Sequence, residues 1–107
     1  MKLSERLEKM NLPGLRETGE MESKDITVKV KLFCPLLSWT WYLVEYDPEN
    51  KEAYGYVDGD CPELGYISIT ELENTRFHLG QVVEIDKHWT PVPLSDVMDS
   101  VKSGTHL

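Results

Sequence analysis

The sequence is poor in positive charge. It has 11 Lys and Arg against 19 Asp and Glu among 107 residues, so its formal net charge is -8. Binding to nucleic acid without sequence preference requires a surplus of cations that neutralise phosphates, and an anionic membrane surface attracts the same residues. The composition therefore argues against direct nucleic-acid binding and against membrane binding. It favours a protein partner with a basic groove, or a small molecule.

Cysteine is also scarce, and no hydrophobic run is long. Cys34 and Cys61 form no C-x-x-C or C-x-x-H pair, so we expect reduced, mostly buried thiols and no metal site. The longest nearly uncharged stretch, residues 32–44, is too short to cross a bilayer. The first ten residues are charged and lack the apolar core of a signal peptide. We expect a cytoplasmic protein that needs no cofactor.

The sequence contains no glycine-rich phosphate loop and one weak catalytic pair. Asp86 and His88 are two residues apart, so on an extended segment a carboxylate could orient an imidazole. We expect instead that Asp86 caps a turn, that His88 packs beside Trp89, and that the protein is not an enzyme. Two alternatives stay open: a small hydrolase-like enzyme that uses Asp86 and His88, and a ligand-binding domain with a pocket beside Trp89.

Alternation of apolar and polar residues is the main structural signal. It predicts strands over residues 26–32, 38–46, 53–57 and 64–69, with a candidate fifth strand within 81–86. In the first of these strands every second residue is apolar and should share one buried face: Ile26, Val28, Val30 and Leu32. Short turns rich in Asp, Pro and Gly separate the later strands, which predicts an antiparallel meander.

Helix-capping residues flank the predicted strands. Ser4 and Ser95 should cap terminal helices, and Ser68 and Thr70 should cap a helix that reaches about residue 78, before Gly80. The prediction is a single α+β domain, residues 1–107, in which short helices pack on one face of a meander of about four strands. Its parts are a helix and solvated linker (1–25), the meander (26–69), a helix, proline segment and last helix (70–102), and a tail (103–107).

Eight of the ten aromatic residues lie in or beside predicted strands. Trp39 and Trp41 should share the buried face of the second strand, and Tyr42 and Tyr46 should share the opposite face. Tyrosine is frequent at the centres of protein interfaces. The candidate anchors for a partner are Tyr46, Tyr54 and Tyr56.

Acidic residues gather at the two turns that join the second, third and fourth strands. They are Asp47, Glu49, Glu52, Asp58, Asp60 and Glu63. One interpretation is a solvated face that keeps the protein soluble. The functional interpretation is an anionic surface that docks on a basic groove of a protein partner and gains association rate from electrostatic steering.

Three stretches together resemble a known family: Phe33 to Tyr42, Glu63 to Glu73, and Asp86 to Ser95. Over residues from about 12 to about 98 they are similar to the bacterial and phage family catalogued as domain of unknown function 2958. Motif positions without an assigned role are Trp39, Trp41, Tyr42, Gly65, Tyr66, Asp86, His88, Trp89 and Pro91.

The resemblance implies a mobile-element accessory role and no reaction, because such proteins often accompany antirestriction and other accessory genes on plasmids, phages and integrated elements. Together with the charge, it leads us to expect a non-enzymatic interaction module. The expected function is inhibition of a host defence nuclease, of the anti-CRISPR or antirestriction type, or modulation of transfer.

Overall fold

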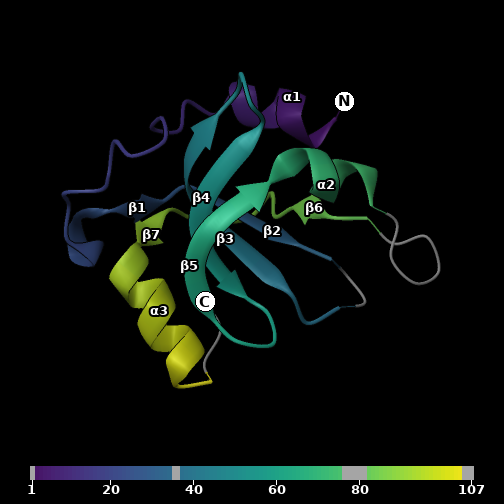
Figure 1. Ribbon diagram of the computed structural model, residues 1–107. Coiled ribbons are helices and arrows are strands. Elements are labelled where there is room, and N and C mark those ends of the chain that lie inside the picture. Colours follow the sequence, from purple (N-terminus) through teal and green to yellow (C-terminus); the bar gives the residue numbers. More distant parts are fainter. Residues whose placement is uncertain (1, 35–36, 76–81, 105–107) are drawn as a thin grey trace.

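The computed structural model describes residues 2–34, 37–75 and 82–104 (Figure 1). These residues contain three α-helices and a 3-10 turn: α1 (Leu3–Glu8), η1 (Ser23–Asp25), α2 (Ile69–Asn74) and α3 (Leu94–Lys102). The strands are β1 (Thr27–Val28), β2 (Val30–Phe33), β3 (Thr40–Asp47), β4 (Glu52–Asp58), β5 (Glu63–Ser68), β6 (Glu84–Ile85) and β7 (Val92–Pro93).

Five of the strands form one antiparallel sheet in the order β5-β4-β3-β2-β6, and β1 pairs with β7 in a separate two-stranded sheet. The predicted α+β class is therefore confirmed. Strands β2 to β5 are the predicted meander, and the candidate fifth strand is present as β6, which pairs with β2 at Leu32–Ile85. The strand count is higher than predicted.

The additional strand arises because the predicted strand 26–32 is divided at Lys29. Its first part, β1, pairs with β7, whereas its second part, β2, pairs with β3 and β6. Val28 and Val30 are both almost completely buried, but they belong to different apolar clusters. The prediction of one shared face is wrong, because the chain passes from one sheet to the other between these two valines.

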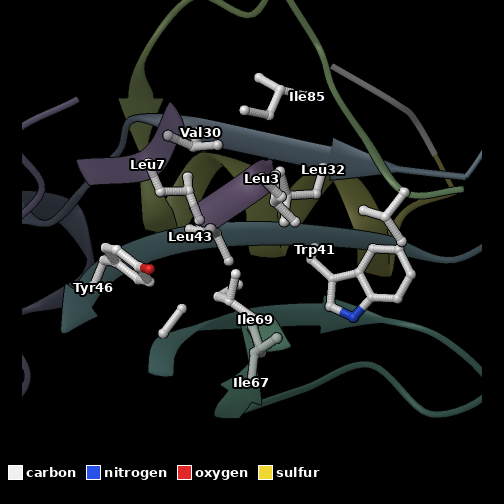
Figure 2. Packing of buried hydrophobic residues seen from close by; sticks show 12 residues of the cluster. Leu3, Leu7, Val30, Leu32, Trp41, Leu43, Tyr46, Ile67, Ile69 and Ile85 are labelled. Carbon is white, nitrogen blue, oxygen red and sulfur yellow. The ribbon is translucent and has the colours of Figure 1, made fainter. Parts of the chain in front are cut away.

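Two apolar cores lie on opposite faces of the large sheet. The first core (Figure 2) joins the sheet to α1 and α2 and comprises Leu3, Leu7, Val30, Leu32, Trp41, Leu43, Tyr46, Ala53, Ile67, Ile69, Val83 and Ile85. The second core joins it to α3 and β1 and comprises Ile26, Val28, Tyr42, Val44, Tyr56, Leu94 and Val97. Helices therefore cover both faces, not one as predicted, and the central strand β3 is buried on both sides.

A β-bulge in β3 decides which side chains enter which core. The register with β4 shifts between Leu43 and Glu45, so one residue is inserted and the alternation of faces is reset. Tyr42 consequently packs in the second core and Tyr46 in the first, and the prediction that they share a face is wrong. Gly55 lies opposite the bulge, where a Cβ would be 2.0 Å from the carbonyl oxygen of Tyr42.

The two tryptophans of the predicted buried face have different environments. Trp41 is 5% exposed in the first core, whereas Trp39 is 36% exposed, with its ring centroid 6.1 Å from that of Trp41. The Trp39 ring lies over Gly59, where an added Cβ would be only 2.7 Å from ring carbons. Only Trp41 behaves as predicted, because Trp39 precedes the paired part of β3.

One of the predicted helix caps is confirmed. The Ser68 hydroxyl accepts a hydrogen bond from the backbone N–H of Glu71 at 3.2 Å and begins α2. Ser4 and Ser95 lie inside α1 and α3, whose N-cap residues are Lys2 and Pro93, and Thr70 lies inside α2, so the predictions for these three residues as caps are wrong. The predicted extension of α2 toward residue 78, and Gly80, lie outside the described residues.

Candidate functional site

A hollow of about 450 Å³ lies between residues 16–26 and the outer face of β4 and β5. Its apolar wall is formed by side chains from the N-terminal segment and from both strands. We call it the Tyr groove and define it by Met21, Ile26, Glu45, Tyr54, Leu64 and Tyr66. It is the site at which the structure brings residues from distant parts of the sequence to one accessible surface.

Glu45 holds one wall of the Tyr groove in place. Its side chain is 2% exposed and accepts hydrogen bonds from the backbone N–H groups of Arg16 and Thr18, both at 2.9 Å. The Thr18 hydroxyl donates to the same carboxylate. Arg16 and Thr18 therefore bind the sheet, because a buried carboxylate must be hydrogen-bonded and these two residues supply the donors. In the rest of the predicted solvated linker, residues 17 and 19–25, every residue except half-buried Ser23 is exposed.

Exposed aromatic and aliphatic side chains form the opposite wall. The rings of Tyr54 and Tyr66 lie 5.0 Å apart, centroid to centroid, at an interplanar angle of 60°. On this wall Tyr66 is 57% exposed and Leu64 40%; Met21, on the wall formed by residues 16–26, is 44% exposed. Large apolar surfaces that remain in contact with water, with polar residues around them, mark interaction sites more often than scattered single residues do.

Two of the three tyrosines predicted as anchors are not accessible. Tyr46 is 3% exposed in the first core (Figure 2) and Tyr56 is 3% exposed in the second. Burial and the nearby Asp58 carboxylate raise the pKa of Tyr56 and that of the equally buried Tyr42. The predicted roles of Tyr46 and Tyr56 as anchors are therefore wrong, because their rings fill the cores; Tyr54 is half-buried and lines the Tyr groove.

The two acidic turns are at opposite ends of β4. Because the strand has seven residues, the turns are separated by about 20 Å along the sheet. They therefore do not form one compact anionic patch. Tyr54 lies between them, with Tyr66 beside it on β5.

Hydrogen bonds close the first acidic turn. The Asp47 carboxylate accepts from the Asn50 side chain at 2.8 Å and from the backbone N–H of Glu49 at 3.0 Å, and these bonds lower its pKa. Of the six predicted acidic residues, the exposed ones are Glu49, Asp60 and Glu63, and the half-buried ones are Asp47, Glu52 and Asp58.

Asp86 closes a turn, as expected. One carboxylate oxygen accepts a hydrogen bond from the backbone N–H of His88 at 2.9 Å, and the other lies 3.8 Å from the ammonium of Lys31. The Asp86 carboxylate thus contacts the backbone of His88 and not its ring, and His88 is exposed. Beside Trp89, where the ligand-binding alternative places a pocket, the structure has a hollow of about 250 Å³ lined by Trp89 together with Asp86, His88, Thr90 and Val92.

The remaining candidate ligands are dispersed. Cys34 is buried, but Cys61 is exposed in the second acidic turn, contrary to the expectation of mostly buried thiols. Within residues 2–34, 37–75 and 82–104, no group of three or more His, Cys, Asp and Glu could hold a metal ion. Over the same ranges no helix is long and apolar enough to cross a membrane.

Comparison with known proteins bears on the family. A family model described as a protein of unknown function (DUF2958) matches residues 3–105, nearly the whole chain. The chain belongs to this family. Neither a curated protein nor a solved structure matches it. Within this DUF2958 domain, the motif residues Trp41, Tyr42 and Trp89 lie in or against the two cores, whereas Tyr66 projects into the Tyr groove.

The sequence pattern did not indicate two contributors to the Tyr groove. Met21 lies in a segment without periodicity, and Leu64 was assigned to a strand but not to an exposed face. The sequence does contain a pattern that indicates the exposure of Leu64. The alternation in β5 places Leu64 and Tyr66 on one side and Ile67 on the other, so burial of Ile67 in the first core leaves the other two outside it.

Proposed function

We propose that this protein is a non-enzymatic interaction module that binds a basic surface of a partner protein in the cytoplasm. The observation that carries the proposal is the Tyr groove, in which exposed Tyr66, Leu64 and Met21 adjoin a hollow large enough to receive side chains. Tyrosine provides a large contact area with little loss of side-chain entropy, which is why it is frequent at interface centres.

The charge around the Tyr groove selects the partner. One border, residues 16–25, contains Glu17, Glu20, Glu22 and Asp25 against Arg16 and Lys24. The β4–β5 turn, just before Leu64 in the sequence, contains Asp58, Asp60 and Glu63. Carboxylates at the rim of an apolar site increase the association rate of a cationic partner and oppose an anionic one.

Family membership supports a narrower proposal. The mobile-element association implied for this family makes a nucleic-acid-binding enzyme of host defence, or a protein of the transfer machinery, the partner that we propose. Such enzymes present basic grooves. The protein has a net charge of -8, and its two acidic turns lie at opposite ends of β4. Because the acidic residues do not form one continuous anionic surface, we propose that the protein blocks part of a basic groove and does not imitate a nucleic-acid duplex.

The surroundings of Asp86 support a role without catalysis. Its two carboxylate oxygens are used by the His88 backbone and by Lys31, so the residue holds the turn that follows β6. An enzyme that used Asp86 and His88 would have to release both contacts.

Charge reversal tests the proposal. The protein is immobilised, and captured host proteins are identified and then measured individually at low and at high salt. The triple change of Asp58, Asp60 and Glu63 to Lys should abolish capture of a partner whose binding weakens as salt increases. A matched control reverses three exposed carboxylates on α1 and β6, namely Glu5, Glu8 and Glu84, and changes the net charge by the same amount.

Two results would contradict the proposal. The first is a partner that binds the triple variant as tightly as the unchanged protein at low salt. The second is loss of binding in the control as well, which would make net charge, and not the position of the carboxylates, responsible. Turnover of a substrate that is abolished by His88→Ala would establish the enzyme alternative instead.

A further inference from the structure

We propose that an extended basic segment of the partner adds as a strand to the free edge of β5 and places alternate side chains in the Tyr groove. The inference rests on the proposed function and deepens it, because it names the binding mode and the chemistry of the bound segment.

Strand β5 is an edge strand. In the part of the chain that the structure describes, it pairs with β4 and with no second strand. Figure 1 shows it on the outside of the curved sheet, continuing directly into α2. An edge strand exposes backbone donors and acceptors that can pair with another chain.

The hydrogen-bond phase identifies the exposed backbone groups. The backbone N–H of Ile69 donates to the carbonyl of Lys51 at 2.9 Å, so these two opposed residues form a hydrogen-bonded pair. Pairs in an antiparallel ladder alternate between hydrogen-bonded and non-hydrogen-bonded. Counting back along the register, the residues of β5 whose N–H and C=O groups point away from β4 are Leu64, Tyr66 and Ser68.

A separate contact confirms this phase. In this phase, Ala53 of β4 forms a hydrogen-bonded pair with Ile67 of β5. The Tyr46–Ala53 pair, on the other side of β4, is then non-hydrogen-bonded, so the N–H of Tyr46 points away from β4. That N–H donates to the carbonyl of Pro13 at 2.8 Å. The outward N–H groups of β5 have no such protein partner among the backbone bonds of the described residues.

The exposed edge and the exposed side chains coincide. Leu64 and Tyr66 present their backbone groups at the free edge and their side chains at the Tyr groove. In an added strand, alternate residues would lie beside these two side chains, at the distance of cross-strand neighbours. The hollow of about 450 Å³ below them is positioned to receive one aromatic or aliphatic side chain of that strand.

The edge lacks the usual protection against pairing. Protected edges carry Lys or Pro, are interrupted by bulges, or are covered. The six residues of β5 are Glu-Leu-Gly-Tyr-Ile-Ser, and their pairing with β4 is continuous from Glu63 to Ser68. The charge at its start is negative.

Electrostatics distinguish the candidate occupants. A second copy of this chain would bring another net charge of -8 to an acidic border, and a nucleic acid would bring phosphates to the same carboxylates. A segment with Lys or Arg between apolar residues would place its apolar side chains beside Leu64 and Tyr66 and its cations on the opposite face, which Glu63 shares with Ile67. A basic strand is therefore the occupant that the surface favours.

The test uses the complete protein and a synthetic peptide with blocked ends, Lys-Val-Lys-Tyr-Lys-Val-Lys. Amide hydrogen exchange and chemical shifts are measured by NMR during titration. We expect exchange to slow at least about tenfold at Leu64, Tyr66 and Ser68, with little change at Gly65 and Ile67, whose N–H groups already bond to β4. A peptide with Glu in place of each Lys should not bind.

Backbone methylation tests the strand pairing itself. Two versions of the peptide are methylated on alternate amide nitrogens, so that each removes the donors of one edge. We expect one version to bind like the unmodified peptide and the other not to bind, because an added strand pairs through a single edge. Equal binding of both versions would overturn strand addition.

Variants of one groove residue separate backbone pairing from side-chain contact. Tyr66→Ala should weaken peptide binding about tenfold or more, and Tyr66→Phe should retain it, because the ring provides the contact. Unchanged binding by Tyr66→Ala would place the peptide elsewhere. Protection of the outward β5 amides without peptide, together with a dimer in solution, would make a second copy the occupant and would also overturn the inference.

This inference and the proposed function can fail separately. If the peptide does not bind but a natural partner is lost on reversal of Asp58, Asp60 and Glu63, strand addition is wrong and the interaction module stands. If the peptide binds as described but no partner responds to charge reversal, the edge is competent for pairing and the proposed function is wrong.

Discussion

The indole Nε1 of Trp89 donates a hydrogen bond to the carbonyl oxygen of Val28 at 3.0 Å, although 61 residues separate them in the sequence. Val28 is the last residue of β1 and immediately precedes the position at which the chain passes to the large sheet. The same ring lies 5.7 Å from Tyr42 and has the ammonium of Lys31 5.6 Å above it. Trp89 therefore joins the two sheets and the second core.

Two replacements of Trp89 should distinguish the contribution of its hydrogen bond to stability from the contribution of its packing. Trp89→Phe leaves the Val28 carbonyl without its donor and should lower the free energy of unfolding by about 1–2 kcal/mol. Trp89→Ala also removes the packing and should cost more. Urea denaturation measures both, with exposed His88→Ala as a control expected within about 0.5 kcal/mol of the unchanged protein. A Trp89→Phe variant as stable as the unchanged protein would show that the bond contributes nothing net.

Two glycines in paired strands should respond in opposite ways to alanine. At Gly55 a Cβ would meet the Tyr42 carbonyl, so Gly55→Ala should lower the free energy of unfolding by about 3 kcal/mol or prevent folding. At Gly65, directly across the strand pair, no non-adjacent atom of the described residues lies within 4 Å of an added Cβ, so Gly65→Ala should raise the free energy of unfolding by about 0.5 kcal/mol. Thermal denaturation of the pair distinguishes the sites; similar losses at both would contradict this account.

Loss of the buried carboxylate should release the wall of the Tyr groove. Glu45→Ala deprives the amides of Arg16 and Thr18 of their acceptor and should lower the free energy of unfolding by about 2–4 kcal/mol. Amide exchange at Thr18 should become much faster. Exposed Glu49→Ala is the control and should change neither quantity. Protection of Thr18 that survives the Glu45 change would show that other contacts hold the segment.

The hydroxyl of Tyr46 should make stability sensitive to alkaline pH. It is buried and has no hydrogen-bond partner among the described residues; burial, together with the carboxylates of Glu8, Glu73 and Asp47, raises its pKa to about 12. Below pH about 10 the group is neutral in the folded and the unfolded chain. Between about 10 and 12 the unfolded chain releases the proton first, so the free energy of unfolding should fall as pH rises through this range.

Tyr46→Phe should reduce that dependence and leave only the part due to Tyr42 and Tyr56, whose pKa values are also raised. Stability at neutral pH should be unchanged or higher by up to about 1 kcal/mol, because no hydrogen bond is lost. Denaturation as a function of pH measures both effects. Tyr66→Phe, at an exposed ring, serves as the comparison and should keep the alkaline loss. If Tyr46→Phe destabilises the protein at neutral pH, the hydroxyl has a partner in solution.

Local sequence determined the central elements of the fold. Alternation in β4 and β5, the turn residues between them and the Ser68 cap are short-range signals, because each depends on residues within a few positions. The same signals established the meander and the burial of Trp41. They were sufficient for the α+β class and, with the motif spacing, for the family.

The tertiary structure alone decided which face each side chain occupies. The bulge after Leu43 and the passage between sheets at Lys29 leave no periodic signal, because β3 is apolar on both faces and both cores accept the same residue types. The sequence pattern therefore predicts Tyr46 and Tyr56 as exposed anchors for a partner, whereas both are buried in the structure.

The Tyr groove has the same origin. It exists because residues 16–18 bind Glu45, which is 27 residues away from Thr18, and because β5 stays at the edge of the sheet while its inner face is buried. Neither condition is written in a local pattern. The sequence determined strands, turns and an acidic charge; the long-range hydrogen bonds and the order of the strands decided which tyrosines face a partner.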